Sequence, residues 1–377
     1  MVKLYATMNS MLRLTKHLYN CDEVIYSLIT SLINKRELKE CYFWTFELYY
    51  SEIDVFPILW KIYLDFYFKL NPVLERHFRK HHAICKKERN NKSVAFIIKN
   101  LFQSKSCYDV FILVQYSTIA EHPTMIYKGR KPKWCLQYPS EYQNWLRSID
   151  KNHYENMVYY TKKLLNTKPS SEVFGILVQY FAYKMEIEID TDVYAFIETR
   201  MDGHDLEYML AMILHLNMPE RDFVYKNIFT LPTKKELLWI KETQEYDIEC
   251  HKILKYKRLY EIDDLIGCFP LAREKVNSMI DMLRNNWEFY AYRTPLWKKR
   301  IDNFGGIVDE ETKKIIFEDE EKLELFYESF GLEPDEQSLD IQNKSAKEIT
   351  KKNNAVFIPD NTIIPLSDDF QFKYMEN

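Results

Sequence analysis

The stretch CDEVIYSLITSLINKRELKECYFWTFELYYSEIDVFPILWKIYLDFYFKL, residues 21–70, decides the fold. Apolar residues recur in it at spacings of three and four, as at Val24, Leu28 and Leu32, which is the period of a helix with one buried face. Polar loops interrupt the period twice, so the stretch predicts three consecutive helices. Pro57 follows the second loop, where the first turn of a helix tolerates proline. Residues 42–50 and 58–68 are apolar nearly all round, which predicts burial on more than one side.

The composition of the whole chain favours the same class. Only 7 of the 377 residues are glycine, about a quarter of average usage, and tight β-turns and phosphate-binding loops depend on glycine. Rossmann, P-loop and multi-stranded β folds are therefore disfavoured. A hydrophobic fraction of 46% with 15% aromatic residues excludes a wholly disordered chain. We expect an all-α protein of stacked helical hairpins.

A weak internal repeat indicates how the helices are arranged. Residues 96–117 (FIIKNLFQSKSCYDVFILVQYS) align with residues 158–181 (VYYTKKLLNTKPSSEVFGILVQYF) at an offset of 63, which becomes 64 after Gly175. Each copy predicts a helix, a polar turn and a second helix, and both contain the run ILVQY. Chance similarity of two apolar helices is the alternative. A true repeat would stack hairpins in a solenoid-like or irregular array, each hairpin covering the next.

The rest of the chain divides into shorter predicted elements. An irregular insert rich in proline and aromatic residues occupies 121–143. Alternation around a polar turn predicts a minor β-hairpin at 306–317, and an acidic helix follows at 319–330. Further helices are expected at 193–199 (with Asp190 or Thr191 as N-cap), 205–216, 234–259 and 271–291.

Four regions follow from these elements. After Gly331 the periodic apolar positions end, which predicts a flexible, disordered C-terminal tail with one docking peptide at 356–366. The regions are an N-terminal helical domain with a basic C-terminal end (1–94), a helical-hairpin repeat region (95–300), a small hairpin with an acidic helix (301–332) and the tail (333–377).

Cysteine usage and hydropathy predict the compartment. The 7 cysteines are scattered and form no CxxC pair, which is typical of buried free thiols in a reducing environment. The N-terminal residues have no apolar core of signal-peptide length, and no stretch approaches the about 18 apolar residues that a membrane span needs. We expect a cytoplasmic protein with no membrane partner.

The net charge of −4 hides an asymmetry. Residues 1–164 carry 25 Lys+Arg against 15 Asp+Glu, a net +10, whereas residues 165–377 carry 27 against 41, a net −14. The two halves therefore face different partners, or each other.

Two basic segments are the candidate contact surfaces. The first has seven cations within residues 75–93: Arg76, Arg79, Lys80, Lys86, Lys87, Arg89 and Lys92. On a helix, Arg76, Arg79, Lys80 and Lys87 fall near one face, a spacing that can neutralise successive phosphates. The alternatives are a solvated helix and loop, or contact with an acidic partner or with the chain's own acidic half.

The second basic segment interleaves charge with aromatic side chains. It contains Lys128, Arg130, Lys131 and Lys133 beside Tyr127 and Trp134. Aromatic rings among cations can stack on bases, although ordinary surface loops share this mixture.

Metal and catalytic patterns are weak. His81, His82 and Cys85 form HHxxC, which lacks the paired short spacings of a zinc site, and the motifs of serine hydrolases, P-loops, zinc proteases and zinc deaminases do not occur. We expect no metal, no cofactor and no catalytic residue. The most enzyme-like patch is ETRMDGHDLEY, residues 198–208, for which a turn with an N-cap at Asp202 or Asp205 is the simpler interpretation. Glu47, Asp54 and Asp65 are acids within apolar stretches.

Residues 21–75, together with TPLWKKRIDNFGG (294–306) and FYESFGLEPDEQS (326–338), resemble uncharacterised helical proteins of nucleocytoplasmic large (giant) DNA viruses. The Tyr-, Ile-, Asn- and Lys-rich, Gly-poor usage is similar to that of such AT-rich genomes. The resemblance covers about a third of the chain by its helix-packing patterns, and no functional residue carries over. The layout of successive helices ending in ELYYSEIDVFPILWKIYLDFYFKLNP also resembles the oligomerisation collar of clamp-loader AAA+ ATPases, although the nucleotide-binding module is missing.

The sequence therefore favours binding over catalysis. We expect a non-enzymatic interaction or scaffold protein of a viral replication, transcription or virion complex, in the host cytoplasm, the viral factory or the virion. Protein partners are expected, and homo-oligomer formation stays open. The alternatives are a nucleic-acid-binding accessory factor that uses residues 76–92 and 128–133, and an enzyme with an unrecognised helical pocket.

Overall fold

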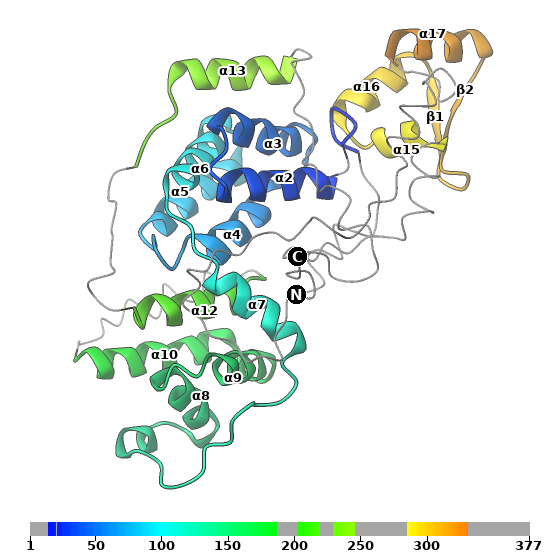
Figure 1. Cartoon of the computed structure of the whole chain (residues 1–377). Coiled ribbons are helices and arrows are strands. Elements are labelled where there is room, and N and C mark those ends of the chain that lie inside the picture. Colours follow the sequence, from blue (N-terminus) through cyan, green and yellow to red (C-terminus); the bar gives the residue numbers. More distant parts are fainter. Residues whose placement is uncertain (1–13, 20, 187–202, 219–228, 246–284, 331–377) are drawn as a thin grey trace, which may run out of the picture.

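The computed structural model describes residues 14–19, 21–186, 203–218, 229–245 and 285–330. Within these residues the chain is helical apart from one β-hairpin and its loops (Figure 1), which confirms the predicted all-α class. The elements are α2 (Cys21–Ile33), α3 (Leu38–Tyr50), α4 (Val55–Phe66), α5 (Leu74–Lys87), α6 (Asn91–Gln103), α7 (Asp109–Ile119), the 3-10 helix η1 (Lys133–Gln137), α8 (Ser140–Asp150), α9 (Tyr154–Thr167), α10 (Ser170–Met185), α12 (Asp205–Leu216), α13 (Lys234–Glu245), α15 (Trp287–Ala291), α16 (Pro295–Asn303), β1 (Gly306–Asp309), β2 (Lys314–Phe317) and α17 (Glu320–Phe330).

The three helices predicted for residues 21–70 are α2, α3 and α4. Asp54 caps α4 by accepting a hydrogen bond from the Phe56 backbone N–H at 3.1 Å, which satisfies one of the free donors of the first turn. Nearly every side chain of α3 from Glu40 to Tyr49 is buried, so the all-round apolar pattern is explained by contacts with α2, α4, α6 and α13.

One large core joins the helices from α2 to α13, with buried residues running from Val24 to Ile240. Helix α12 packs against α4, α7, α9 and α10, and α13 packs against α3 and α6. Segments far apart in the sequence therefore close the same core. This core contains residues from both sides of position 94. The domain boundary predicted at that position stays a prediction.

The repeated segments fold into corresponding helices, α6 with α7 and α9 with α10. Matched positions of the two copies are buried alike, as Val110 and Val173, or Phe111 and Phe174. Within the first copy, however, α6 packs against α3, α5 and α13, while α7 packs against α4, α9 and α12. Each unit of a solenoid contacts its neighbours along the chain, so a solenoid-like arrangement is not confirmed.

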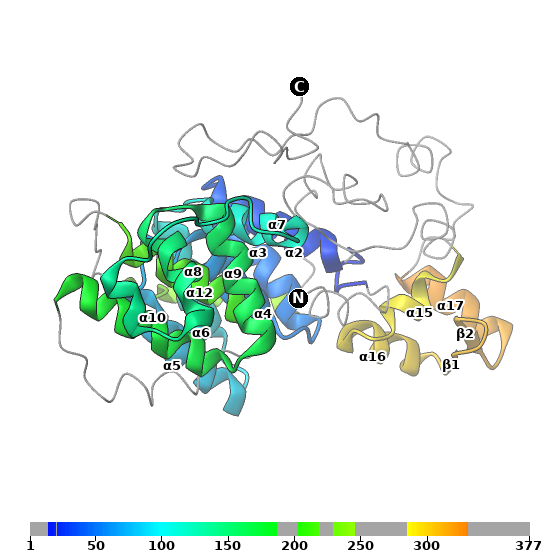
Figure 2. The ribbon, with the colours of Figure 1, turned by 90° about the horizontal axis from the view of Figure 1, so that it is seen from below.

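A second, smaller core lies to one side of the helical body (Figures 1 and 2). The predicted hairpin is confirmed as β1 and β2, which pair antiparallel with Ile307 opposite Ile316. The acidic helix follows as α17, whose Phe326 is fully buried among the rings of α15 to α17. Residues 14–19 connect the two cores, because the Lys16 backbone N–H donates to Ser51 Oγ at 2.8 Å and Trp297 Nε1 donates to the Lys16 carbonyl at 3.0 Å.

Several predictions fall outside the described residues. They are the helix at 193–199 with its N-cap at Asp190 or Thr191, the parts of the helices predicted beyond residue 245 and between 271 and 284, and the tail with its docking peptide at 356–366. Among the helices that the structure does describe, none combines the length and the apolar character that a bilayer crossing requires.

Candidate nucleic-acid interface

Helix α5 lies on the outside of the helical body because only one of its sides is apolar. Leu74 and Phe78 are fully buried, and the Phe78 ring stacks on Tyr63 of α4 with a centroid separation of 4.9 Å. The opposite side faces solvent and carries most of the cations predicted to form a contact surface. The sequence thus fixes which side of α5 stays available.

The histidines of α5 are used inside the fold. His81 Nδ1 lies 3.0 Å from Ser93 Oγ, and the ring stacks on Phe96. His82 accepts a hydrogen bond from Trp60 Nε1 at 3.1 Å. Burial, with a smaller contribution from the nearby cations Lys80 and Lys92, lowers the pKa of His81 to about 4. At neutral pH the positive charge of α5 therefore comes from its lysines and arginines.

The donors of the HHxxC pattern do not converge. His81 and His82 face different neighbours, and Cys85 Sγ donates to the Asn90 carbonyl at 3.6 Å. Over the whole described part of the chain, no group of three or more His, Cys, Asp or Glu side chains is placed to hold a metal ion.

Five cations form what we call the α5 basic face. All five are exposed, and none has a partner in the ion pairs found among the described residues. Three of them, Arg76, Lys80 and Lys87, lie within about 40° around the helix axis. The members of the face are Arg76, Lys80, Lys86 and Lys87 of α5, together with Lys92 at the start of α6.

The other two predicted cations of this segment differ from the five. The Arg79 guanidinium lies 2.5 Å from Glu75 Oε1 and 5.4 Å from the centre of the Trp60 ring, so it faces the body rather than solvent. Arg89 donates to the Tyr49 carbonyl, packs on the Tyr49 ring at 4.6 Å and lies 3.7 Å from Glu52. The helical spacing predicted that Arg79 lies on the exposed face. Its ion pair with the buried carboxylate of Glu75 instead directs the guanidinium toward the helical body.

The second basic segment belongs to an ordered loop. Gln143 of α8 accepts from Lys131 Nζ at 2.5 Å and donates to the Tyr138 carbonyl at 2.7 Å. Asn156 of α9 bonds the backbone N–H and carbonyl of Met125. Lys128, Arg130, Lys131 and Lys133 are all exposed along this loop. Helices α8 and α9 thus hold the irregular insert in one conformation.

The two basic segments lie apart on the helical body. Helix α5 lies in the upper part of Figure 1 and the loop with η1 at the bottom. The structure therefore presents two separate basic surfaces rather than one continuous patch.

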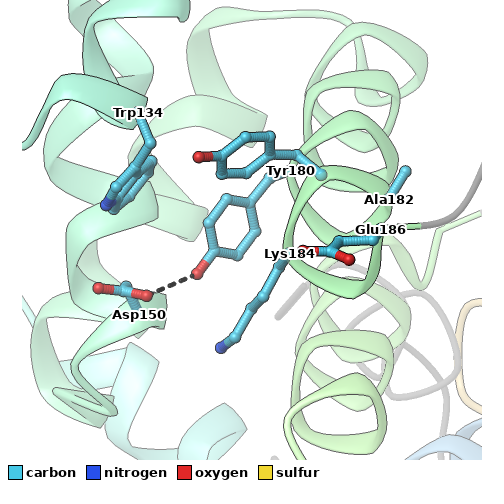
Figure 3. Close-up of a pocket in the computed structure, with 7 residues that line it drawn as sticks. Trp134, Asp150, Tyr180, Ala182, Lys184 and Glu186 are labelled. Carbon is cyan, nitrogen blue, oxygen red and sulfur yellow. Dashed lines mark hydrogen bonds between the residues drawn. The ribbon is translucent and has the colours of Figure 1, made fainter.

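A pocket of about 590 Å³ lies beside Trp134, between η1 and the C-terminal end of α10. Figure 3 shows Trp134 facing Tyr180, whose hydroxyl donates to Asp150 Oδ1 at 3.2 Å. The Trp134 and Tyr180 ring centres are 5.5 Å apart. The remaining lining residues are Ala182, Tyr183, Lys184 and Glu186.

Sequence reasoning identified Trp134 but missed the rest of this pocket. Asp150 ends α8, a helix that was not predicted. Tyr180, Ala182, Tyr183 and Lys184 stand on the last two turns of α10, and Glu186 is its C-cap. The run SEYQNWLRSID, residues 140–150, does carry helical spacing at Tyr142, Trp145, Leu146 and Ile149, so that signal could have revealed α8.

The acids within apolar stretches serve the fold. Lys61 Nζ lies 2.9 Å from Asp65 Oδ2 and 3.1 Å from Glu207 Oε1, and the two carboxylate side chains are 2% and 1% exposed. Burial raises the pKa of Asp65 to about 6 although Lys61 opposes it. Burial also raises the pKa of Glu207, but Lys61 and His204 outweigh this and hold it below its usual value. Carboxylates closed off in this way have no access to a substrate.

The enzyme-like patch is only partly described, since Arg200 and Asp202 lie outside the described residues. Helix α12 begins at Asp205, with His204 as N-cap and no side-chain cap hydrogen bond. Neither predicted N-cap therefore occupies that position within the described part of the turn. The Asp205 carboxylate instead accepts from the Ser170 hydroxyl at the start of α10.

Comparison with known proteins adds no relative to this picture. No protein-family model matches the sequence, and no similar protein was found among curated proteins or solved structures.

Proposed function

We propose that this chain is a non-enzymatic interaction protein that binds nucleic acid through the α5 basic face. The carrying observation is that Arg76, Lys80, Lys86, Lys87 and Lys92 are exposed together with no ion-pair partner among the described residues. In line with the sequence resemblance, we place this activity in a viral replication, transcription or virion complex.

The length of the face supports a polyanion as the partner. From Arg76 to Lys87 the helix rises about 16 Å, which matches the axial length of about five base pairs. The two acids of the segment oppose this charge only in part, because Glu75 is buried against Arg79 and Glu88 stands at the C-cap of the helix. A row of cations of this length can contact several successive phosphates.

The affinity expected from such a face depends steeply on salt. Five phosphate contacts give a slope of about −4.5 in log K against log salt for duplex DNA. Raising the salt concentration four-fold should then weaken binding about 500-fold. Fluorescence anisotropy with a labelled duplex, measured over a salt series, gives this slope directly.

Charge reversal tests the location of the contact. The variant R76E/K80E/K87E should lose duplex binding at low salt, because three attractive contacts become repulsive. The matched control K298E/K299E/K314E changes the net charge equally on exposed lysines of α16 and β2 and should bind like the unaltered chain. Circular dichroism establishes that both variants are folded.

Two results would contradict the proposal. One is the absence of duplex or single-strand binding at low salt, and the other is equal loss of binding in the α5 variant and the control. Affinity purification from infected cells with mass spectrometry would then name the protein partners of the complex.

A further inference from the structure

We propose that the pocket between η1 and α10 binds the base of an unpaired nucleotide, so that the protein engages single-stranded nucleic acid there. This inference rests on the proposed function, because it gives the bound nucleic acid a second contact with a different chemistry.

The pocket offers aromatic surface that the fold does not consume. Trp134 is half-buried, and Tyr183 is 55% exposed at the rim. Leu136 and Met185 on the same two elements are also exposed. Exposed aromatic rings at a cavity provide stacking surfaces, and stacking tolerates any base because every base has a flat face.

Cations and hydrogen-bond acceptors both lie at the pocket, whose lining includes Lys184 together with Asp150 and Glu186. Lys131 and Lys133 are exposed in the chain next to Trp134, and Lys184 is exposed on α10. These cations suit a phosphate backbone passing the rim. Asp150 and Glu186 line the pocket as hydrogen-bond acceptors, which suits the exocyclic amino groups of bases.

The size and order of the pocket agree with this ligand. A volume of about 590 Å³ lies in the range of small-molecule and cofactor sites. The loop that carries Trp134 is fixed by Gln143, and the ring contact between Trp134 and Tyr180 holds the wall in place. Because the loop and the ring pair are already ordered, binding of a ligand costs less conformational entropy than it would in a flexible loop.

The pocket should select unpaired bases. In a duplex the faces of each base are covered by its neighbours, so only a single-stranded or unstacked base can enter and stack. The α5 basic face contacts phosphates and makes no such distinction. Loss of the pocket should therefore weaken binding of single strands only, whereas loss of the α5 basic face should weaken binding of both single strands and duplexes.

The test compares a labelled single-stranded DNA of about 16 nucleotides with the duplex of the same sequence. Tyr183→Ala should weaken single-strand binding about 5- to 150-fold, the range found for loss of base stacking, and leave duplex binding unchanged. Trp134→Ala should do the same, whereas Trp134→Phe, which keeps an aromatic face, should retain most of the affinity. The control Trp239→Ala removes a half-buried tryptophan of α13 outside the pocket and should change neither probe.

The slope with salt separates stacking from charge. Tyr183→Ala should lower the single-strand affinity without changing the slope, whereas Lys133→Glu should make the slope shallower by about 0.7. Tyr183 is exposed, so its alanine variant is expected to fold even where Trp134→Ala does not.

Each outcome decides the inference. Unchanged single-strand affinity in Tyr183→Ala, or equal loss on both probes, overturns it. The proposed function fails by a different result, namely duplex binding that survives R76E/K80E/K87E.

Discussion

The buried ion cluster between α4 and α12 yields the sharpest prediction about stability. Lys61 pairs with two carboxylates that are almost fully buried, Asp65 and Glu207. The substitution Lys61→Met keeps most of the aliphatic stem and removes the charge. Two carboxylates are then left without a cation, and breaking a buried pair in this way costs about 3–5 kcal/mol of the free energy of unfolding.

The loss should depend on pH with a definite sign. In the unaltered chain the folded pKa of Asp65 is raised to about 6, so its contribution favours the folded state below the unfolded value of about 4 and is lost as pH rises through about 6. Without Lys61 the folded pKa of Asp65 rises further, and that of Glu207 loses the main cause that keeps it below its usual value. The loss of unfolding free energy caused by Lys61→Met should therefore become smaller as the pH falls and the carboxylates are protonated. The change is about 1.4 kcal/mol for each unit by which the substitution raises a folded pKa.

Denaturant unfolding followed by helical circular dichroism at about pH 5 and about pH 8 measures both effects. The matched control is Lys168→Met, because Lys168 pairs with Glu141 and Glu172 at 3.2 and 3.7 Å on the surface. This exposed pair is screened by water, so the substitution should leave the free energy of unfolding almost unchanged at either pH. The triple variant K61M/D65L/E207M, which removes all the charges, should recover most of the loss. A cost of Lys61→Met as small as that of the control, or one that grows on acidification, would refute the reasoning.

Three further substitutions test separate parts of the structure. Gln143→Ala removes two hydrogen bonds of the loop at residues 121–139; it should cost about 1–3 kcal/mol and speed cleavage of this loop in limited proteolysis. Gly306→Ala would place a Cβ atom 2.5 Å from Ile301 Cγ2; overpacking of about 1–3 kcal/mol should accelerate hydrogen exchange in the β-hairpin, and unchanged exchange there would contradict the packing. Asp109→Asn leaves the buried Lys69 without its carboxylate; denaturant unfolding should show a loss of about 3–5 kcal/mol, and a loss under about 1 kcal/mol would mean that the pair is solvated.

The local elements were predictable from the sequence because their signals are local. The boundaries of α12 coincide with the predicted 205–216, and the hairpin at 306–317 was found from its alternation and polar turn. Helix α8 was not predicted because it begins at Ser140, inside the proline- and aromatic-rich segment 121–143 that predicts a loop. Pro132 precedes η1 and Pro139 precedes α8, and both have an extended backbone. This conformation is typical of a loop and not of a helix.

The candidate surfaces were predictable only in part. Exposure of Lys80 and Lys87 follows from helical periodicity, since Phe78 fixes the opposite side of α5. The partner of Arg79 and the pocket around Trp134 depend on contacts between elements, such as the Trp134–Tyr180 ring pair. A single sequence carries no direct signal for pairs of this kind, and the same limit applies to the stacking order of the repeated helices.

The position of α12 has a consequence for the order in which the chain can fold during synthesis. Lys61 meets Glu207 across a separation of 146 residues, a stretch that takes about 7–30 s to translate at about 5–20 residues per second. Throughout that interval the α12-facing side of α4, including its charged cluster, emerges from the ribosome without its final cover. Unfinished chains of this kind are substrates for chaperones, so supply of the folded protein depends on the folding capacity of the cell that makes it.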